Sequence, residues 1–206
     1  AWETLFERLD IRRPVAGAAN ALLVIGAAGG VGSIAIQLAK TLTDTAVIAT
    51  ASRPASRDWV RALGADFVVN HHEPLPAQIA ALGIGAPAFV FSTSHSDAYL
   101  PAIAELIAPQ GRIAVIDDPA TLDVNPLKSK SLSLHWEFMF TRALWQTADI
   151  AAQGQILREV AALVDAGKIR TTLTERLDGI NAANLRHAHA LLERGDAIGK
   201  VVLSGW

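Results

Sequence analysis

The residues with the clearest chemical capability are glycines within residues 21–35, ALLVIGAAGGVGSIA, a run that predicts a buried strand, a glycine-rich turn and a helix. Gly29 would let a pyrophosphate approach the backbone, and Gly32 would let the helix pack closely against the strand. The first N–H groups of the helix and its dipole favour an anion. Because Ala27 stands where the strict dinucleotide fingerprint has glycine, the pattern is A-x-G-x-x-G. We therefore expect dinucleotide binding, with a plain tight turn as the alternative.

The end of the second expected strand, residues 46–51, distinguishes between cofactors. Folds that bind NAD place an acid about 20 residues past the glycines, where it accepts hydrogen bonds from the ribose. Residues 50–54 read TASRP, without an acid. Ser52 can donate to a 2′-phosphate and Arg53 can hold it with a planar guanidinium, and Arg57 follows one turn later. The sequence therefore predicts NADP(H), the alternative being that Arg53 is a solvated residue before a helix.

Other nucleotide-binding classes fit these residues less well. No Lys-Ser or Lys-Thr pair directly follows the glycines, which excludes a Walker phosphate loop. Methyltransferases that bind SAM have a glycine-rich first loop, but they usually carry an acid at the end of the second strand. A short-chain dehydrogenase needs Tyr-x-x-x-Lys, and the single tyrosine, Tyr99, has Ile103 at that spacing, which excludes that class.

These residues require a frame of strands and helices that alternate along the chain. Near-continuous apolar strands are expected at residues 21–25, 46–51, 67–70, 88–92 and 112–116, with helices at residues 30–42, 56–63, 74–82 and 99–107. A sixth strand, residues 131–138, has alternating polarity instead. This order predicts an α/β doubly wound six-stranded parallel sheet, a Rossmann fold, with strand order 3-2-1-4-5-6.

Further elements are expected at both ends of the chain. Residues 1–9 form an amphipathic helix without a capping residue, which is typical of a chain cut from a longer protein. The expected C-terminal elements are a helix at residues 147–166, a short β segment near residues 171–174, a helix at residues 181–193 and a last strand at residues 200–203. We expect an NADP-binding domain over residues 1–170 and a separate C-terminal segment over residues 171–206.

Composition narrows the classes of function. The 206 residues carry a net charge of −2, so no global attraction to nucleic acid or to a membrane surface is expected. The chain has no cysteine, which excludes disulfides, thiolate nucleophiles and cysteine-based zinc sites within it. No apolar run reaches membrane-spanning length and no signal segment opens the sequence, so the default expectation is a cytoplasmic protein.

The histidines do not form a metal site by spacing alone. His71 and His72 are neighbours and would point in opposite directions on an extended chain. His187 and His189 are two apart on a helix and lie roughly 200° apart around it. Zinc needs three or four convergent ligands, so no metal site is expected. His95 is a candidate proton relay, although a Ser/Thr-rich loop more often forms a turn and a helix cap.

Two longer runs carry a family resemblance. Residues 21–40, ALLVIGAAGGVGSIAIQLAK, and residues 49–75, ATASRPASRDWVRALGADFVVNHHEPL, closely resemble the medium-chain dehydrogenase/reductase superfamily. They are most similar to its zinc-type alcohol dehydrogenase-like branch, near the quinone oxidoreductases. AWETLFERLDI at the start and GKVVL at residues 199–203 resemble the helix that enters the cofactor domain and the terminal strand of that branch.

The resemblance implies the NADP(H)-binding portion of an oxidoreductase. Such an enzyme transfers a hydride between nicotinamide and a carbonyl, a quinone, or an activated alkene or alcohol. In the family, a GroES-like barrel precedes this portion and supplies most of the substrate pocket and any catalytic zinc ligands. The C-terminal segment, residues 171–206, would pack on that barrel. We therefore expect this chain to bind cofactor and to be inactive alone, the alternative being a non-catalytic NADPH-binding or sensing module.

The resemblance also assigns positions to site residues. The loop from Ser92 to His95 and the loop holding Asp117 and Asp118 would lie along the nicotinamide end, and Lys200 would reach a phosphate. No catalytic residue is assigned. The expected cofactor-binding residues are Ala28, Gly29, Gly30, Val31, Ser52, Arg53, Arg57, Ser92, Thr93, Asp117 and Lys200.

The sixth expected strand, Ser131 to Phe138, predicts a homodimer. It would form the edge of the sheet, and it holds no proline, no lysine and one charged residue, Glu137. Its even positions are all apolar. An edge of this kind favours pairing with a second copy across a two-fold axis, as related medium-chain enzymes do. The alternative is that residues 118–130 or the following long helix cover the edge in a monomer.

Overall fold

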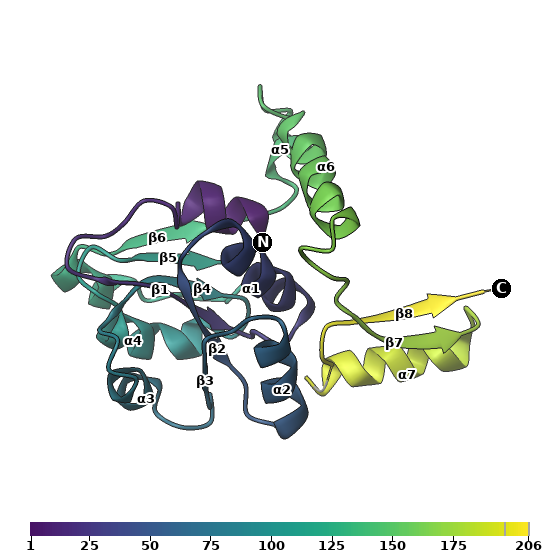
Figure 1. Ribbon diagram of the computed structural model, residues 1–206, viewed down its shortest axis with the longest axis horizontal. Coiled ribbons are helices and arrows are strands. Elements are labelled where there is room, and N and C mark those ends of the chain that lie inside the picture. Colours follow the sequence, from purple (N-terminus) through teal and green to yellow (C-terminus); the bar gives the residue numbers. More distant parts are fainter. Residues whose placement is uncertain (196, 206) are drawn as a thin grey trace.

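The computed structural model describes residues 1–195 and 197–205, and its core is a six-stranded parallel sheet (Figure 1). The order β3-β2-β1-β4-β5-β6 confirms the predicted Rossmann topology. The strands are β1 (Ala19–Ile25), β2 (Ala46–Thr50), β3 (Phe67–Val69), β4 (Pro87–Ser92), β5 (Arg112–Val115) and β6 (Ser133–Trp136).

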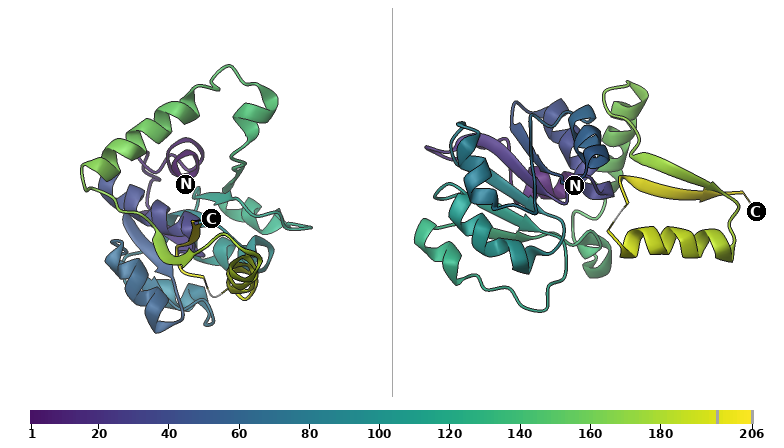
Figure 2. Two further views of the ribbon diagram at one scale, coloured as in Figure 1. Left: turned by 90° about the vertical axis from the view of Figure 1, so that its right-hand side faces the viewer. Right: turned by 90° about the horizontal axis from the view of Figure 1, so that it is seen from below.

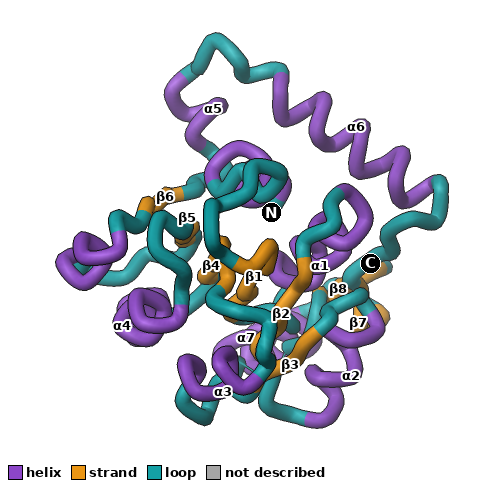
Figure 3. Tube along the Cα trace, turned by 60° about the vertical axis from the view of Figure 1, so that its left-hand side comes forward, coloured by secondary structure: helices purple, strands orange, loops and turns teal. Residues whose placement is uncertain are grey.

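Helices cover both faces of the sheet, because its central strands are apolar on both sides. In β1, Leu22 and Val24 belong to one hydrophobic cluster, whereas Leu23 and Ile25 belong to a second. The first cluster includes side chains of α1 and α2, and the second includes side chains of α3 and α4. Figure 3 shows α3 and α4 together, apart from α1. The helices are α1 (Gly30–Leu42), α2 (Pro54–Ala62), α3 (Leu75–Ala81) and α4 (Ser96–Leu106).

A buried arginine fastens the N-terminal segment to the sheet. The guanidinium of Arg112, at the start of β5, donates to the backbone carbonyls of Leu9 at 2.6 Å, Asp10 at 2.8 Å and Arg13 at 3.0 Å. Burial lowers the pKa of this arginine. The expected opening helix is present, but its central part, η1 (Thr4–Arg8), is π-helical.

The sixth strand is shorter than predicted. The short helix η2 (Asn125–Lys130) ends at Ser131, which adopts a left-handed conformation with φ 52°, so β6 begins only at Ser133. The strand ends at Trp136, although the Glu137 N–H still donates to the Val115 carbonyl of β5 at 3.0 Å; the Glu137 carboxylate is buried and accepts from the guanidinium of Arg8 at 2.7 Å. The prediction of a strand through Phe138 was wrong at both ends, because local turns that the alternating pattern does not show interrupt it.

The long helix predicted for residues 147–166 is also shorter. A separate helix, α5 (Thr141–Trp145), precedes it, and α6 runs from Ala152 to Asp165. Between them, Asp149 accepts from the Thr147 hydroxyl at 2.6 Å and from buried Arg142 at 3.0 Å. Arg142 also pairs with Glu3 and Glu7 of the N-terminal helix. The turn thus forms around an ion-pair cluster whose partners lie far apart in sequence.

The C-terminal elements form a separate layer that projects from the sheet (Figures 1 and 2). They are β7 (Leu173–Asp178), α7 (Ala182–Glu193) and β8 (Lys200–Ser204), and the two strands pair in parallel. The predicted boundary near residue 170 stays a prediction. Within the described residues, no helix combines the length and the apolar character needed to cross a bilayer.

Candidate dinucleotide-binding site

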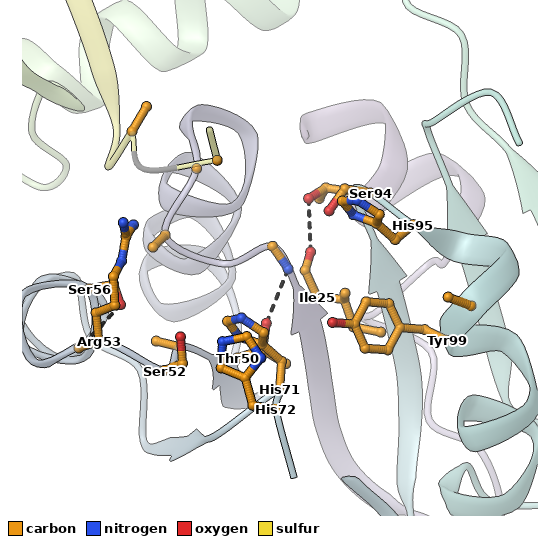
Figure 4. A pocket seen from close by; sticks show the side chains of 18 of the residues that line it. Ile25, Thr50, Ser52, Arg53, Ser56, His71, His72, Ser94, His95 and Tyr99 are labelled. Carbon is orange, nitrogen blue, oxygen red and sulfur yellow. Dashed lines mark hydrogen bonds between the residues drawn. The ribbon is translucent and has the colours of Figure 1, made fainter. Parts of the chain in front are cut away.

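A cavity of about 710 Å³ lies at the carboxyl ends of the strands, where ligands of doubly wound sheets bind. Its walls come from the turn after β1, the end of β2, the turn after β3, the loop after β4, the first turns of α4, and residues 194, 195 and 197 (Figure 4). The volume falls within the range of about 300–1,000 Å³ that is typical of small-molecule pockets.

The turn after β1 depends on a glycine that the fingerprint did not include. Gly26 has φ +72°, and a Cβ on it would collide with the Thr93 hydroxyl. Its N–H donates to the Thr50 hydroxyl at 3.1 Å, and the Thr93 hydroxyl donates to the Ile25 carbonyl at 2.8 Å. These contacts tie the glycine turn to the ends of β2 and β4 (Figure 4).

The two fingerprint glycines occupy different environments. A Cβ on Gly32 would lie 2.6 Å from the backbone of Ala27 and Gly26, so this glycine permits the close packing of helix and strand that the sequence predicted. Gly29 occupies the N-cap position of α1 and lines the cavity, with no side chain bonded to the first helical N–H groups. Those groups have no partner within the helix and are available to an anion.

The acid-free end of β2 lies in the cavity wall. Ser52 and Arg53 both line it, whereas Arg57, one turn into α2, does not. The helix begins at Pro54, with Arg53 at the cap position and its carbonyl accepting from the Ser56 hydroxyl at 2.9 Å. Ser56, where the sequence predicted this helix to begin, therefore lies within its first turn.

Ser92 and Asp117 are not among the residues that line the cavity. The Ser96 hydroxyl donates to the Asp117 carboxylate and accepts from the Ser92 hydroxyl at 2.7 Å, and the Ser96 N–H donates to Asp117 at 2.9 Å. The carboxylate that follows β5 thus bonds to the N-terminus of α4. Thr93 lines the cavity, as does His95, which has φ +53° at the cap position of α4.

The C-terminal segment meets the glycine turn directly. The Gly199 N–H donates to the Ala28 carbonyl at 2.8 Å, and Gly199 forms an isolated bridge with Gly29. The side chain of Lys200 lies over Gly30, where a Cβ would meet it. Lys200 therefore reaches the start of α1. Of the expected residues in this region, Ala28 and Gly29 line the cavity, whereas Gly30, Val31 and Lys200 do not.

Four residues of the cavity lining are not among the predicted cofactor-binding residues. They are His71, His72, Tyr99 and Arg194. The expectation that the two imidazoles point in opposite directions was wrong. The chain turns directly after β3, and the ring centroids of His71 and His72 are 4.4 Å apart. An Asn followed by polar residues after a short strand, NHHEP, is the signal that indicates such a turn.

Comparison with known proteins identifies this arrangement. A family model described as zinc-binding dehydrogenase matches residues 63–203. The chain belongs to the zinc-binding dehydrogenases. As a member of the medium-chain dehydrogenase/reductase superfamily, it corresponds to the NAD(P)-binding part of these oxidoreductases.

Individual relatives agree with this assignment. The chain is 37% identical over 206 residues to the zinc-type alcohol dehydrogenase-like protein SAS2087 of Staphylococcus aureus, which covers 99% of this chain and 61% of that protein. It is 57% identical to a candidate zinc-dependent alcohol dehydrogenase of Rhizobium etli whose crystal structure superimposes with a TM-score of 0.96, covering 100% of this chain and 60% of that one. The human mitochondrial NAD(P)H oxidoreductase RTN4IP1 is 31% identical over 198 residues, covering 89% of this chain and 47% of that protein. The chain thus spans about 60% of the first two relatives.

The family implies two bound groups, a dinucleotide and a zinc ion. The described residues fit the dinucleotide but not the zinc. The cavity, the cap position of Gly29 and the open first turn of α1 fit a dinucleotide. Zinc does not fit: among residues 1–195 and 197–205, no three His, Cys, Asp or Glu side chains lie close enough together to hold a metal ion.

Proposed function

We propose that this zinc-binding dehydrogenase chain is the NADP(H)-binding portion of an enzyme that transfers a hydride between nicotinamide and a carbonyl, a quinone, or an activated alkene or alcohol. The observation that carries the proposal is the end of β2, where Ser52 and Arg53 line the cavity in place of an acid. A carboxylate there would repel a 2′-phosphate, whereas a guanidinium binds one through two parallel hydrogen bonds. The human relative's name, NAD(P)H oxidoreductase, is compatible with either cofactor.

Each part of the cavity has a separate task in this proposal. Gly29 and the N–H groups of the first turn of α1 hold the pyrophosphate. Ser52 and Arg53 hold the 2′-phosphate, and Arg57 adds positive charge one turn away. The bound cofactor supplies the hydride chemistry, and the protein supplies binding and orientation.

The remaining expected residues act around this frame. Thr93 lines the cavity toward the nicotinamide end, and Ser92 and Asp117 hold α4 in place. Lys200, over the first turn of α1, adds a positive charge near the pyrophosphate.

Substitution of Arg53 tests the cofactor preference. We expect Arg53→Ala to weaken NADPH binding by about tenfold to a hundredfold, because a charge-assisted hydrogen bond contributes roughly 1.5–3 kcal/mol. NADH binding should stay within about twofold, since NADH has no 2′-phosphate. The matched control is Arg61→Ala on the same helix, where Arg61 pairs with Asp58 at 3.4 Å and lies outside the cavity lining. Equal affinities of the unmodified chain for NADPH and NADH would refute the preference.

We also propose that the chain alone binds cofactor with little or no turnover. Its described residues contain no group of three His, Cys, Asp or Glu side chains that could hold a metal ion. NADPH oxidation against a panel of carbonyls and quinones, together with metal analysis after dialysis, tests this. Steady turnover, or one tightly bound zinc per chain, would contradict it.

A second copy of the chain is the partner that we propose for the sheet edge. The edge strand β6 ends at Trp136, and the apolar residues 138–140 follow Glu137; Trp136 and Phe138 are 53% and 52% exposed. Leu134→Pro removes a ladder donor from β6, and we expect it to convert a dimer to a monomer in sedimentation.

Since Leu134 also packs on the core, Trp136→Lys serves as a second variant that changes only exposed surface. Leu192→Lys, on exposed α7, is its control. If the unmodified chain sediments as a monomer at tens of micromolar, the dimer proposal fails.

A further inference from the structure

Two adjacent imidazoles stand in the wall of the cofactor cavity next to the end of β2. His71 is half-buried and His72 is exposed, and their rings are tilted by 50° with centroids 4.4 Å apart. Figure 4 shows both rings between Ser52 and Tyr99. They also line an adjoining hollow of about 560 Å³, so they lie where the two spaces meet.

The backbone of this turn is held by side chains other than the imidazoles. Asn70 accepts from the His72 N–H at 3.1 Å. Gln78 accepts from the Asn70 N–H and donates to the Asn70 carbonyl, both at 2.8 Å. The imidazoles can therefore be replaced without removing these bonds, and their presence in the cavity is not required to form the turn.

Two arginines and a third imidazole line the cavity that the pair faces. They are Arg53, Arg194 and His95, and Tyr99 lies on the facing helix α4. On the side of the adjoining hollow the charged groups are Glu73, which accepts from Asn70 at 2.9 Å, and Glu105. Burial lowers the pKa of His71, and the charges of His72 and Arg53 lower it further. The folded chain thus disfavours the protonated form of His71.

A phosphate bound beside Arg53 would oppose the effect of the guanidinium on the pKa of His71. A phosphate dianion bound at Arg53 acts on His71 with the opposite sign to the guanidinium, because it brings negative charge to the same place. We infer that His71 and His72 form a proton-linked part of the cofactor site, which takes up a proton when the 2′-phosphate end of NADP(H) binds. This inference rests on the proposed preference for NADP(H).

The sign of the linkage follows from the two states. The phosphate raises the pKa of His71, so the bound state holds more protons than the free state. NADPH affinity therefore rises as pH falls through the window around the ordinary imidazole pKa of about 6.5. A shift of about one pKa unit corresponds to at most about tenfold, and that limit is reached only at a pH below the pKa of both states. Because the pKa of His71 in the free chain is lowered, we expect up to about twofold tighter binding of NADPH at about pH 6.5 than at pH 8. The affinity for NADH, which lacks the phosphate, should not change over this range.

Protonation of the phosphate itself acts in the other direction. A phosphate monoester takes up its second proton near pH 6, so binding of the dianion to a positively charged site releases protons. Titration of the imidazoles therefore gives net proton uptake when NADPH binds, whereas titration of the phosphate gives net proton release. The sign of the net proton exchange identifies which group titrates.

Calorimetric titration of the full 206-residue chain with NADPH and NADH, at about pH 7 in two buffers of different ionisation enthalpy, counts the protons exchanged. We expect net uptake with NADPH and none with NADH. The variants His71→Gln and His72→Gln, singly and together, should reduce the uptake and flatten the pH dependence of NADPH affinity. The matched control is His189→Gln, at an exposed imidazole of α7 outside both cavities, which should leave uptake unchanged.

The outcomes separate this inference from the proposed function. Net proton release with NADPH, or unchanged uptake in the double variant, overturns the inference even when NADPH is preferred over NADH at pH 8. Equal affinities for the two cofactors at every pH overturn the preference for NADP(H) and the inference with it. Should the double variant fail to fold, the uptake by the unmodified chain and by the two single variants still decides the question.

Discussion

In the central strands of the sheet, Ala21–Ile25 of β1 and all of β4 are buried, whereas the paired strands β7 and β8 carry no buried residue in the part of the chain that the structure describes. Several large apolar side chains of the C-terminal layer are exposed to solvent. Leu192 is 60% exposed, and Leu185 and Val202 are 41% exposed. Both regions are regular secondary structure, yet only the sheet buries a core of its own.

The contrast shows that the two regions are stabilised in different ways. A two-stranded sheet is at best marginally stable alone, because it cannot cover an apolar face. The C-terminal layer is held to the sheet at a few polar points. Gly199 bonds to Ala28, and Gln37 exchanges two hydrogen bonds with the backbone of Arg170. Its exposed apolar surface supports the prediction that residues 171–206 pack on a further domain.

The largest expected effect tests the contrast in burial. Phe91→Ala, at a fully buried position of β4, should lower the free energy of unfolding by about 3–5 kcal/mol, because it removes a large side chain and leaves a cavity. Leu192→Ala, on α7, should change it by no more than about 0.5 kcal/mol. Urea denaturation followed by circular dichroism measures both. A comparable loss in the two variants would show that the C-terminal layer contributes a core that we have not identified.

The glycine turn, where the two regions meet, allows a finer comparison. In Gly32→Ala the new methyl group meets backbone 2.6 Å away, so we expect a loss of about 1–3 kcal/mol and weaker cofactor binding. In Gly30→Ala the methyl group meets the end of the flexible Lys200 side chain, which can move. That variant should stay within about 1 kcal/mol of the unmodified chain. If Gly30→Ala is the more damaging of the two, the contact of Lys200 is more rigid than its side-chain chemistry indicates.

The smallest expected effect is on the pH dependence of the free energy of unfolding. It is tested at one histidine in the sheet and one in the C-terminal layer. Burial lowers the pKa of His135 in β6, and the charges of Arg8 and Arg112 lower it further. The folded chain therefore binds this proton less readily than the unfolded chain. The free energy of unfolding should fall as pH drops below the ordinary imidazole pKa of about 6.5.

Replacement of this imidazole should remove that part of the pH dependence. We expect His135→Leu to show a shallower fall in stability on acidification than the unmodified chain. The measurement is urea denaturation at about pH 8 and about pH 5.5, on either side of the imidazole range. His189→Gln, at an exposed position of α7, is the control. An unchanged slope in His135→Leu would assign the acid sensitivity to other groups.

The topology of the sheet could be predicted from the sequence because each strand is a short apolar run bounded by turn residues. The glycine run, the acid-free end of β2 and the apolar strands are local signals. They are enough to indicate strand order and the edge at which a nucleotide binds. The elements after residue 130 could not be predicted as well, because Ser131, with φ 52°, and the Arg142 cluster decide where β6 and α6 begin.

The amino-acid sequence by itself determined the parallel sheet, the close packing at Gly32 and the presence of Ser52 and Arg53 beside the glycine turn. These depend on residue type and on spacing within a few tens of residues. Only the tertiary structure decided that His71 and His72 face the cavity, that Asp117 bonds to α4 and that Gly199 docks on Ala28. Each of these contacts joins segments whose separation in space is set by the packing of the whole sheet, which no local pattern of residues encodes.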